Sequence, residues 1–293
     1  MMSPFIHQVS VIIPSYNRNS LIKETIESVL KQTYTQYELI IVDDASTDGT
    51  ADWISKEYPD IKLVRLTRNR GSAGARNIGI NEATGDLIAF LDHDDQWLPN
   101  YLEIQVKTLQ DSPQAVLSFC NYSEINIHGE KRDYNLKPWR IYSNPIHHLL
   151  MENIIHTMSI VVIRRSALTQ AGLLNEKLKI CNDRELYLRL LYSGDMVHIP
   201  QNLVSKTLHA SNLSGNYRLW SKEAQMLLKI FFSDPKSKPY KFLEAEAKSH
   251  WSLKLAKIVW QQHHDVIFCL QMIGQAFWFA PGLISKRIWK RLR

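Results

Sequence analysis

The sequence predicts an α/β fold, in which a mainly parallel central sheet is flanked by helices and followed by a C-terminal helical extension. Over the first 120 residues, short β-branched apolar runs alternate with stretches whose apolar residues follow the helical period. Such alternation is typical of βαβ units, which pair their strands in parallel. After about residue 216 the strand pattern stops and helical periodicity continues. We therefore divide the 293 residues into a first domain at 1–215 and a C-terminal helical region at 216–293.

The individual elements follow from the length of each apolar run, its β-branched content and its period. The alternating part predicts strands at 9–13, 38–42, 62–66, 87–91 and 115–120, and helices at 21–30, 50–57, 74–83 and 99–110. The later part predicts strands at 159–164 and 205–208, and helices at 184–191, 220–232 and 242–270.

Composition and charge exclude several classes of protein. Hydrophobic residues make up 45% of the chain and charged residues 22%, as in a folded globular protein and unlike a disordered one. The net charge is +6, but Val266–Arg293 holds five basic residues and no acidic one, so the remainder carries only about +1. A nearly neutral body does not favour binding to nucleic acid.

The cysteines and the N-terminus indicate a cytoplasmic setting. Cys120, Cys181 and Cys269 are odd in number and widely separated, so they predict neither a disulfide framework nor a metal site. The N-terminal stretch lacks a basic segment followed by a long apolar run, which argues against a signal peptide.

Acidic residues gather directly after two of the predicted strands. Asp44 follows the second strand, and Asp92, Asp94 and Asp95 follow the fourth. The carboxyl ends of parallel strands meet at one edge of a sheet, where such folds bind their ligands. Three carboxylates within four positions repel one another unless a cation lies between them, and oxygen ligands on a short loop suit Mg²⁺ or Mn²⁺. The alternative is an acidic, solvated turn that caps the next helix.

Three further segments each have two interpretations. In 42–50, an Asp just past the strand could accept from a base N–H or a ribose hydroxyl, or the Asp, Ser and Thr residues could only form a turn and a helix cap. The small residues around Arg76, at a predicted helix start, could bind an anion, or they could only form a surface connection between two elements. Asp183, at the mouth of a predicted helix, could act as a general base or only as an N-cap. The glycine spacings of a dinucleotide fingerprint and of a P-loop are absent from the sequence.

Taken in order, these segments resemble the family 2 glycosyltransferases of the GT-A fold. The resemblance covers about residues 8–215 and rests on VSVIIPSYNR, QTYTQYELIIVDDASTDGT and NRGSAGARNIGINEATGDLIAFLDHDDQWLP. It implies a GT-A type, Rossmann-like fold and an inverting transfer of a sugar from a nucleotide-diphosphate sugar, UDP-linked, to a hydroxyl group. The implied acceptor is a glycan or a lipid-linked molecule in the synthesis of cell-surface polysaccharide or lipopolysaccharide-type glycans.

The resemblance also implies roles for single residues on the donor side. Asp44 would address a uracil-type ring, and Arg76 would lie near the base or the diphosphate of the nucleotide. The full set of implied nucleotide-sugar-binding residues is Pro14, Tyr16, Asp44, Arg76, Asp92 and His93.

For catalysis the resemblance implies a Mn²⁺ or Mg²⁺ ion held by Asp94, Asp92 and His209, and Asp183 as the base that deprotonates the acceptor. The chain departs from the family next to that base. Asn182 stands where a Glu is common, so the expected acceptor contacts differ here.

Other activities remain as alternatives. A non-catalytic module of the same fold that binds a nucleotide sugar or glycan is disfavoured by the presence of Asp92, Asp94 and Asp183. A nucleotidyltransferase would carry a glycine-rich loop after the first strand, where this chain has PSYNR. An NAD(P)-dependent or methyl-transferring Rossmann enzyme lacks support because the glycine fingerprint is missing.

The C-terminal tail is a separate feature. Val266–Ile284 contains no charged residue and approaches the length of a membrane-spanning helix, but Gln271, Gln275 and Pro281 interrupt it. In 284–293, apolar residues recur at every fourth position with basic residues beside them, the pattern of an amphipathic helix on an anionic membrane. This predicts a cytoplasmic protein that is peripheral on the inner face of the membrane. The alternatives are a solvated helix end and a helix packed on the catalytic domain.

Overall fold

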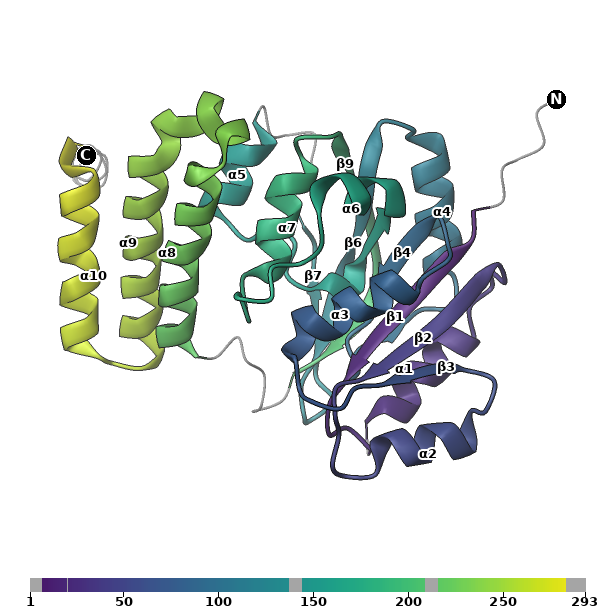
Figure 1. Cartoon of the computed structure of the whole chain (residues 1–293). Coiled ribbons are helices and arrows are strands. Elements are labelled where there is room, and N and C mark those ends of the chain that lie inside the picture. Colours follow the sequence, from purple (N-terminus) through teal and green to yellow (C-terminus); the bar gives the residue numbers. More distant parts are fainter. Residues whose placement is uncertain (1–6, 20, 137–143, 209–215, 283–293) are drawn as a thin grey trace. The chain divides into compact units, whose positions relative to one another are not determined.

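The computed structural model describes residues 7–19, 21–136, 144–208 and 216–282 (Figure 1). Contacts divide the chain into two compact units: Met1–Ser143 with Ile154–Ser211, and Asn144–Asn153 with Asn212–Arg293. The second unit therefore includes a short segment, Asn144–Asn153, that the sequence pattern assigns to the first domain.

In the first unit, the described strands form one sheet in the order β3-β2-β1-β4-β8-β6-β9-β5, with β7 paired to β6. Strands β1 to β4 run parallel, whereas β8 is antiparallel to both β4 and β6. The strands are β1 (Val9–Ser15), β2 (Tyr37–Asp43), β3 (Lys62–Arg65), β4 (Leu87–Phe90), β5 (Gln96–Trp97), β6 (Ala115–Ile125), β7 (Lys131–Tyr134), β8 (Val161–Arg164) and β9 (Asp195–Thr207).

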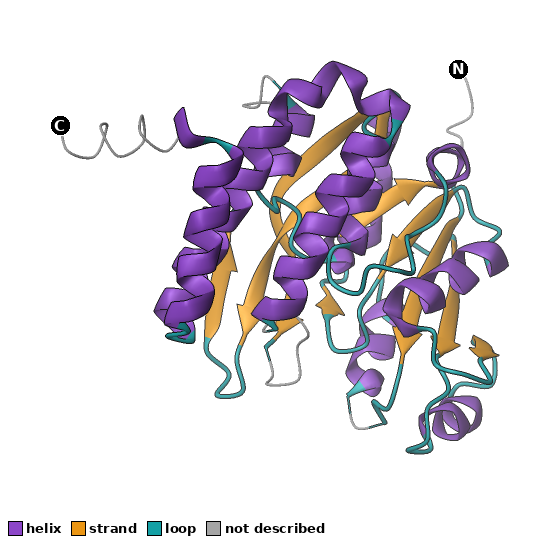
Figure 2. Cartoon of the chain, turned by 60° about the vertical axis from the view of Figure 1, so that its left-hand side comes forward, coloured by secondary structure: helices purple, strands orange, loops and turns teal. Residues whose placement is uncertain are grey.

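Helices of this unit pack along the sheet. Figure 2 shows the helices of the chain in purple and its strands in orange. Strand β1 is buried over its whole length, and the helices turn their apolar residues toward the sheet. The helices of this unit are α1 (Ile22–Leu30), α2 (Thr50–Glu57), α3 (Gly71–Glu82), α4 (Tyr101–Asp111), α6 (Arg165–Ala171) and α7 (Asn182–Leu190). The predicted α/β class with a mainly parallel sheet and flanking helices is confirmed.

Two predicted elements are wrong in extent. The strand expected at 205–208 begins ten residues earlier, because β9 pairs with β6 along its length even where its own sequence is polar. The helix expected at 242–270 is two helices, α9 (Glu244–Gln262) and α10 (Val266–Phe279). The chain breaks at His264, which has φ of 54°, and the Asp265 carboxylate caps α10 by accepting from the Phe268 N–H at 3.1 Å.

The second unit consists of helices. Besides α9 and α10, it contains α5 (Pro145–Met151), α8 (Tyr217–Ser233) and the 3₁₀ helix η4 (Pro235–Leu243). The Trp251 indole N–H of α9 donates to the Leu150 carbonyl of α5 at 2.6 Å. Hydrogen bonds from His250 and then Lys254 lower the pKa of Glu152, next to α5, to about 2. Among the helices that the structure describes, none has both the length and the apolarity needed to cross a bilayer.

Helix α3 approaches strand β1 so closely that its glycine at position 79 has no room for a side chain. A Cβ atom there would lie 2.4 Å from Ile12 Cγ2. We expect Gly79→Ala to lower the free energy of unfolding by about 1–3 kcal/mol, since overpacking outweighs the gain in helix propensity. Gly274→Ala in α10 is the matched control, because a Cβ there meets no atom within 4 Å. Urea unfolding of both variants measures the difference, and an unchanged midpoint for Gly79→Ala would contradict the packing.

Candidate active site

The loops after β1 and β2 are tied together at the carboxyl edge of the sheet. The Asn17 N–H donates to Ser46 Oγ at 2.9 Å, and the Thr47 N–H donates to Asn17 Oδ1 at 2.8 Å. Asn17 and Ala45 both adopt left-handed backbone conformations, with φ of 51° and 62°. Non-glycine residues rarely do so, and such conformations concentrate at binding and catalytic sites.

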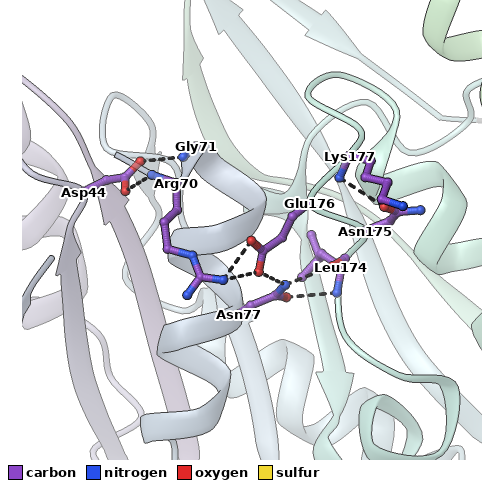
Figure 3. A network of polar contacts seen from close by, with 8 residues as sticks. All are labelled: Asp44, Arg70, Gly71, Asn77, Leu174, Asn175, Glu176 and Lys177. Carbon is purple, nitrogen blue, oxygen red and sulfur yellow. Dashed lines mark hydrogen bonds and ion pairs between the residues drawn. The ribbon is translucent and has the colours of Figure 1, made fainter. Parts of the chain in front are cut away.

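Asp44 lies in this edge and caps helix α3. Its two carboxylate oxygens accept from the backbone N–H groups of Arg70 at 2.7 Å and of Gly71 at 2.8 Å (Figure 3). The residue is buried, and burial raises its pKa. Asp44 therefore fixes the start of α3, a long-range contact that the sequence pattern did not predict. A contact to a nucleotide base stays a prediction, for which the carboxylate retains further lone pairs.

Helix α3 and the residue before it are hydrogen-bonded to the segment that precedes α7. Arg70 Nη2 donates to both carboxylate oxygens of Glu176 at 2.8 Å (Figure 3). The Asn77 amide donates to the Leu174 carbonyl and accepts from the Leu174 N–H, both at 2.9 Å. Sequence reasoning missed Asn77 and Glu176, because their partners lie far away along the chain and no local pattern marks them.

The loop after β4 contains an ion pair between Asp92 and Arg76. Arg76 Nη2 donates to Asp92 Oδ1 at 2.5 Å, and the Thr157 hydroxyl donates to Asp92 Oδ2 at 3.2 Å. Arg76 is only 6% exposed. Burial, the largest single influence, would raise the pKa of Asp92, but the charge of Arg76, the neighbouring His93 and the hydrogen bonds from Arg76 and Thr157 together hold the pKa below its ordinary value. Asp92 is therefore an ionised partner of a buried arginine.

His93 connects this loop to the end of β1. Its Nε2 accepts from Arg18 Nε at 2.7 Å, and its Nδ1 lies 3.0 Å from the Pro14 carbonyl oxygen. These contacts require the neutral form with the hydrogen on Nδ1, which donates to Pro14. Burial lowers the pKa of His93, in agreement with that form. Tyr16, two residues after Pro14, is 43% exposed at the same strand end.

The acidic cluster of this loop divides into carboxylates with different surroundings. Asp95 is buried and accepts from the Ser159 hydroxyl at 2.6 Å and from the Thr207 N–H at 3.2 Å. Burial, together with the charges of Asp92 and Asp94, raises the pKa of Asp95 well above its ordinary value. Asp95 therefore anchors the loop, and the cluster does not present three equivalent metal ligands.

Asp94 is half-buried, between Asp92 and Asp95 in the sequence. Within the described ranges, no group of three His, Cys, Asp or Glu side chains is placed to hold a metal by itself. His209, the third predicted ligand, lies outside the described residues, and so does the predicted amphipathic tail at 284–293.

Asp183 is in the first turn of α7. Its Oδ1 accepts from the Arg184 N–H at 2.6 Å. Burial raises the pKa of Asp183 from 3.8 to about 6, against the opposing charges of Arg76 and Arg184. Because the charges of Arg76 and Asp92 act on Asp183, the structure brings the predicted base together with the acidic loop. A carboxyl group with this pKa is suited to take up a proton near neutral pH.

Two neighbours of Asp183 complete this part of the site. The hydroxyl of Tyr187 is fully buried and has no hydrogen-bond partner within the described part of the chain, and burial and the Asp183 charge raise its pKa. Sequence reasoning missed Tyr187, although it follows Asp183 by one helical turn. The Asn182 amide, in the place of the family's Glu, donates to the carbonyl groups of Leu178 and Lys179.

Comparison with known proteins identifies relatives of this chain. TuaG of Bacillus subtilis, whose name places it among the glycosyltransferases of teichuronic acid biosynthesis, is 45% identical over 129 residues, or 43% of this chain and 50% of that protein. WfgD of Escherichia coli, a UDP-Glc:alpha-D-GlcNAc-diphosphoundecaprenol beta-1,3-glucosyltransferase, is 42% identical over 120 residues, or 40% of this chain and 47% of that protein. The chain spans about half the length of these curated relatives.

Solved structures share the fold. TarS 1–349 of S. aureus in complex with UDP-GlcNAc has a TM-score of 0.63 at 19% identity, over 89% of this chain and 75% of that one. The mannosyltransferase PcManGT of Pyrobaculum calidifontis in complex with GDP-Man and Mn²⁺ has a TM-score of 0.64 at 18% identity, over 99% and 81%. These likenesses confirm the predicted GT-A fold. The family model of glycosyl transferase family 2 matches residues 10–171, more than half of the sequence, and the chain therefore belongs to that family.

Proposed function

We propose that this chain is an inverting glycosyltransferase that moves a sugar from a nucleotide-diphosphate sugar to an acceptor hydroxyl, with Asp183 as the base. The carrying observation is the Asp183 carboxyl, whose pKa burial raises to about 6 beside the Arg76–Asp92 ion pair. Asp183 takes the proton of the acceptor hydroxyl, whose oxygen bonds to the anomeric carbon on the face opposite the diphosphate. The bond from that carbon to the diphosphate breaks, the nucleoside diphosphate leaves, and the configuration inverts.

The donor is proposed to be UDP-linked and to lie along the edge formed by Pro14, Tyr16, Asp44 and His93. Support comes from TarS, whose structure contains UDP-GlcNAc, and from WfgD, whose name contains UDP-Glc. Arg76 supplies a fixed positive charge for the diphosphate. Its buried Nε has no hydrogen-bond partner within the described residues, which leaves one donor for a ligand oxygen.

The residues of the β4 loop fit a divalent cation, Mn²⁺ or Mg²⁺, because they supply carboxylate oxygens. Asp94 would be its main ligand, because it matches the second acid of the D-x-D motif in the family that the sequence resembles and is half-buried at this loop. His209 is kept as a proposed additional ligand. A bound cation would stabilise the negative charge of the departing diphosphate. PcManGT, of the same fold, was solved with Mn²⁺.

The acceptor is proposed to be a glycan or a lipid-linked molecule of cell-surface polysaccharide synthesis, reached from the cytoplasm at the inner face of the membrane. The names of TuaG and WfgD support this class, and that of WfgD includes a diphosphoundecaprenol acceptor. The cysteines Cys120, Cys181 and Cys269 are buried and not joined by disulfides, which agrees with a reducing compartment.

Nucleotide protection tests the proposed donor. With UDP and MnCl₂ the protein is expected to unfold about 5 °C higher at a hundredfold excess over Kd, and less so with GDP or ADP. A panel of UDP-sugars then identifies the donor by release of UDP in the presence of a lipid-linked acceptor. Protection without turnover on any sugar would instead support the non-catalytic binding module, and protection by no nucleotide would contradict both.

A further inference from the structure

Helix α10 exposes an apolar face. Its 14 residues contain no charged side chain. The face formed by Phe268, Cys269, Met272 and Ala276 is buried, and the first three belong to an apolar cluster with residues of α9. Outside that buried face the helix exposes the apolar side chains of Val266, Ile267, Leu270, Ile273, Phe277 and Trp278. The polar Gln271 and Gln275 flank them.

This face, Val266 to Trp278, differs from the scattered apolar residues that every protein surface carries. Ile267, Leu270, Ile273 and Phe277 recur at spacings of three and four residues, so they lie on one side of the helix. Val266 and Trp278 extend this strip at its two ends. Trp278 is 84% exposed and Ile267 is 71% exposed. Continuous apolar surface of this kind marks a site of contact with a membrane or another protein.

Length decides how such a helix could meet a membrane. At 1.5 Å per residue, α10 is about 21 Å long, and the hydrocarbon core of a bilayer is about 30 Å thick. A helix with one face packed on its own unit and the other face apolar is suited to lie in the plane of the interface. Trp278, close to the end of the helix, is a residue type that prefers the headgroup region.

Basic residues lie beside this helix. Phe279, the last residue of α10, borders a cavity of about 410 Å³ that is also lined by Lys229, Lys241 and Lys248. Glu244, in the same lining, is paired with Lys241 and Lys248, so the three lysines exceed the acidic charge there. These lysines meet α10 at its C-terminal end, at the residue after Trp278, and positive charge there complements a surface of anionic lipids.

The sequence that follows α10 adds further positive charge. Residues 283–293 lie outside the described structure, but they contain five basic side chains and no acidic one. The apolar strip ends next to Phe279, which contacts one of these lysines, and a basic segment follows it in the sequence. Positive charge at this end of the helix favours an anionic bilayer over a second copy of this basic chain as the occupant.

We propose that the exposed face of α10 docks this chain on an anionic membrane surface, with the helix lying in the interface. The proposal adds a defined contact surface to the proposed function, and membrane docking does not depend on the chemistry at Asp183. Loss of docking and loss of transfer are therefore separable in experiments.

Flotation with vesicles of phosphatidylcholine and phosphatidylglycerol tests the docking. The variant carrying Ile267→Gln, Leu270→Gln and Trp278→Gln is expected to reduce the membrane partition coefficient by about tenfold or more, at low and at high salt, because apolar contact is not screened. Deletion of 284–293 is expected to reduce binding mainly at low salt. Ile127→Gln, in the first unit and 77% exposed, is the matched control and should bind as the wild type does.

Two results would overturn the proposal. One is a triple variant that floats with vesicles as well as the wild type, with binding lost only on deletion of the tail. The other is wild-type protein that forms a dimer in light scattering, which the triple variant converts to a monomer without any change in vesicle binding. Thermal unfolding shows whether the triple variant remains folded, and the single substitution Trp278→Gln, with a smaller loss expected, provides a second measurement if it does not.

Discussion

Asp183→Asn is expected to reduce turnover by about 10³-fold while leaving the protein folded. Asparagine has nearly the same shape, and its side-chain oxygen can still accept from the Arg184 N–H, which bonds Asp183 Oδ1 at 2.6 Å. The substitution therefore removes the proton acceptor and little else. Release of the nucleoside diphosphate in the presence of acceptor measures turnover. Asp60→Asn, at an exposed position of the same unit, serves as the control and should be fully active.

The pH dependence gives an independent test of the same group. The base must be ionised to act, so kcat/KM is expected to rise with pH through about 6 and then to level off, as set by the raised pKa of Asp183. In Asp183→Asn the residual activity should lack this rise. Near-wild-type turnover of the variant, or an unchanged profile, would show that another group is the base.

The same pKa shift has a consequence for stability. Between pH 3.8 and about 6 the folded state binds more protons at Asp183 than the unfolded state does, because burial raises the folded pKa. Stability from this group therefore falls as pH rises through that window. At pH 7 the folded protein holds a buried, ionised carboxylate, which lowers its stability. Asp183→Asn removes that charge, so the variant should unfold at the same temperature as the wild type at pH 7, or higher. Loss of activity with retained stability separates a functional carboxylate from a structural one.

Local features of this chain are predictable from its sequence, and long-range ones are not. The strands β1, β2 and β4 are continuous buried runs, and the positions of their carboxyl ends predict that Asp44 and Asp92 lie at one edge of the sheet. The hydrogen bonds of these residues were not predictable. Asp44 binds two N–H groups about 26 residues away, and Glu176 binds an arginine 106 residues away. Neither pairing leaves a periodic trace in the sequence.

Spacing alone was also unable to distinguish the acids of the β4 loop. Asp94 and Asp95 are adjacent in the sequence, but the Asp95 carboxylate is directed to Ser159 and Thr207, which belong to segments far along the chain. The strand β9, which contributes Thr207, was predicted at less than half of its length, because its pairing with β6 overrides its polar composition. The extent of β9 and the partners of Asp95 depend on residues far away along the chain, so a local sequence pattern does not predict them.

Because the acids of the β4 loop have different surroundings, we expect the loss of Asp94 alone to lower turnover strongly. We expect Asp94→Ala to reduce turnover by about 10²–10³-fold, the loss typical when a group that stabilises developing charge is removed. Asp92 and Asp95 are poor substitutes, because Arg76 and Thr157 donate to Asp92, while Ser159 and Thr207 donate to Asp95. Nucleoside diphosphate release at increasing MnCl₂ concentrations is the measurement, and the variant should need more Mn²⁺ for any remaining activity.

Asp95→Asn is the matched control, since it removes one carboxyl group from the same loop. Burial and two neighbouring acids raise the pKa of Asp95, so a neutral amide resembles the form that its surroundings favour. This variant should retain most of the activity and the Mn²⁺ dependence of the wild type. If Asp95→Asn were as inactive as Asp94→Ala, the summed charge of the cluster would matter and not the position of one carboxylate. Wild-type turnover of Asp94→Ala at the same Mn²⁺ concentration would remove Asp94 from the proposed metal site.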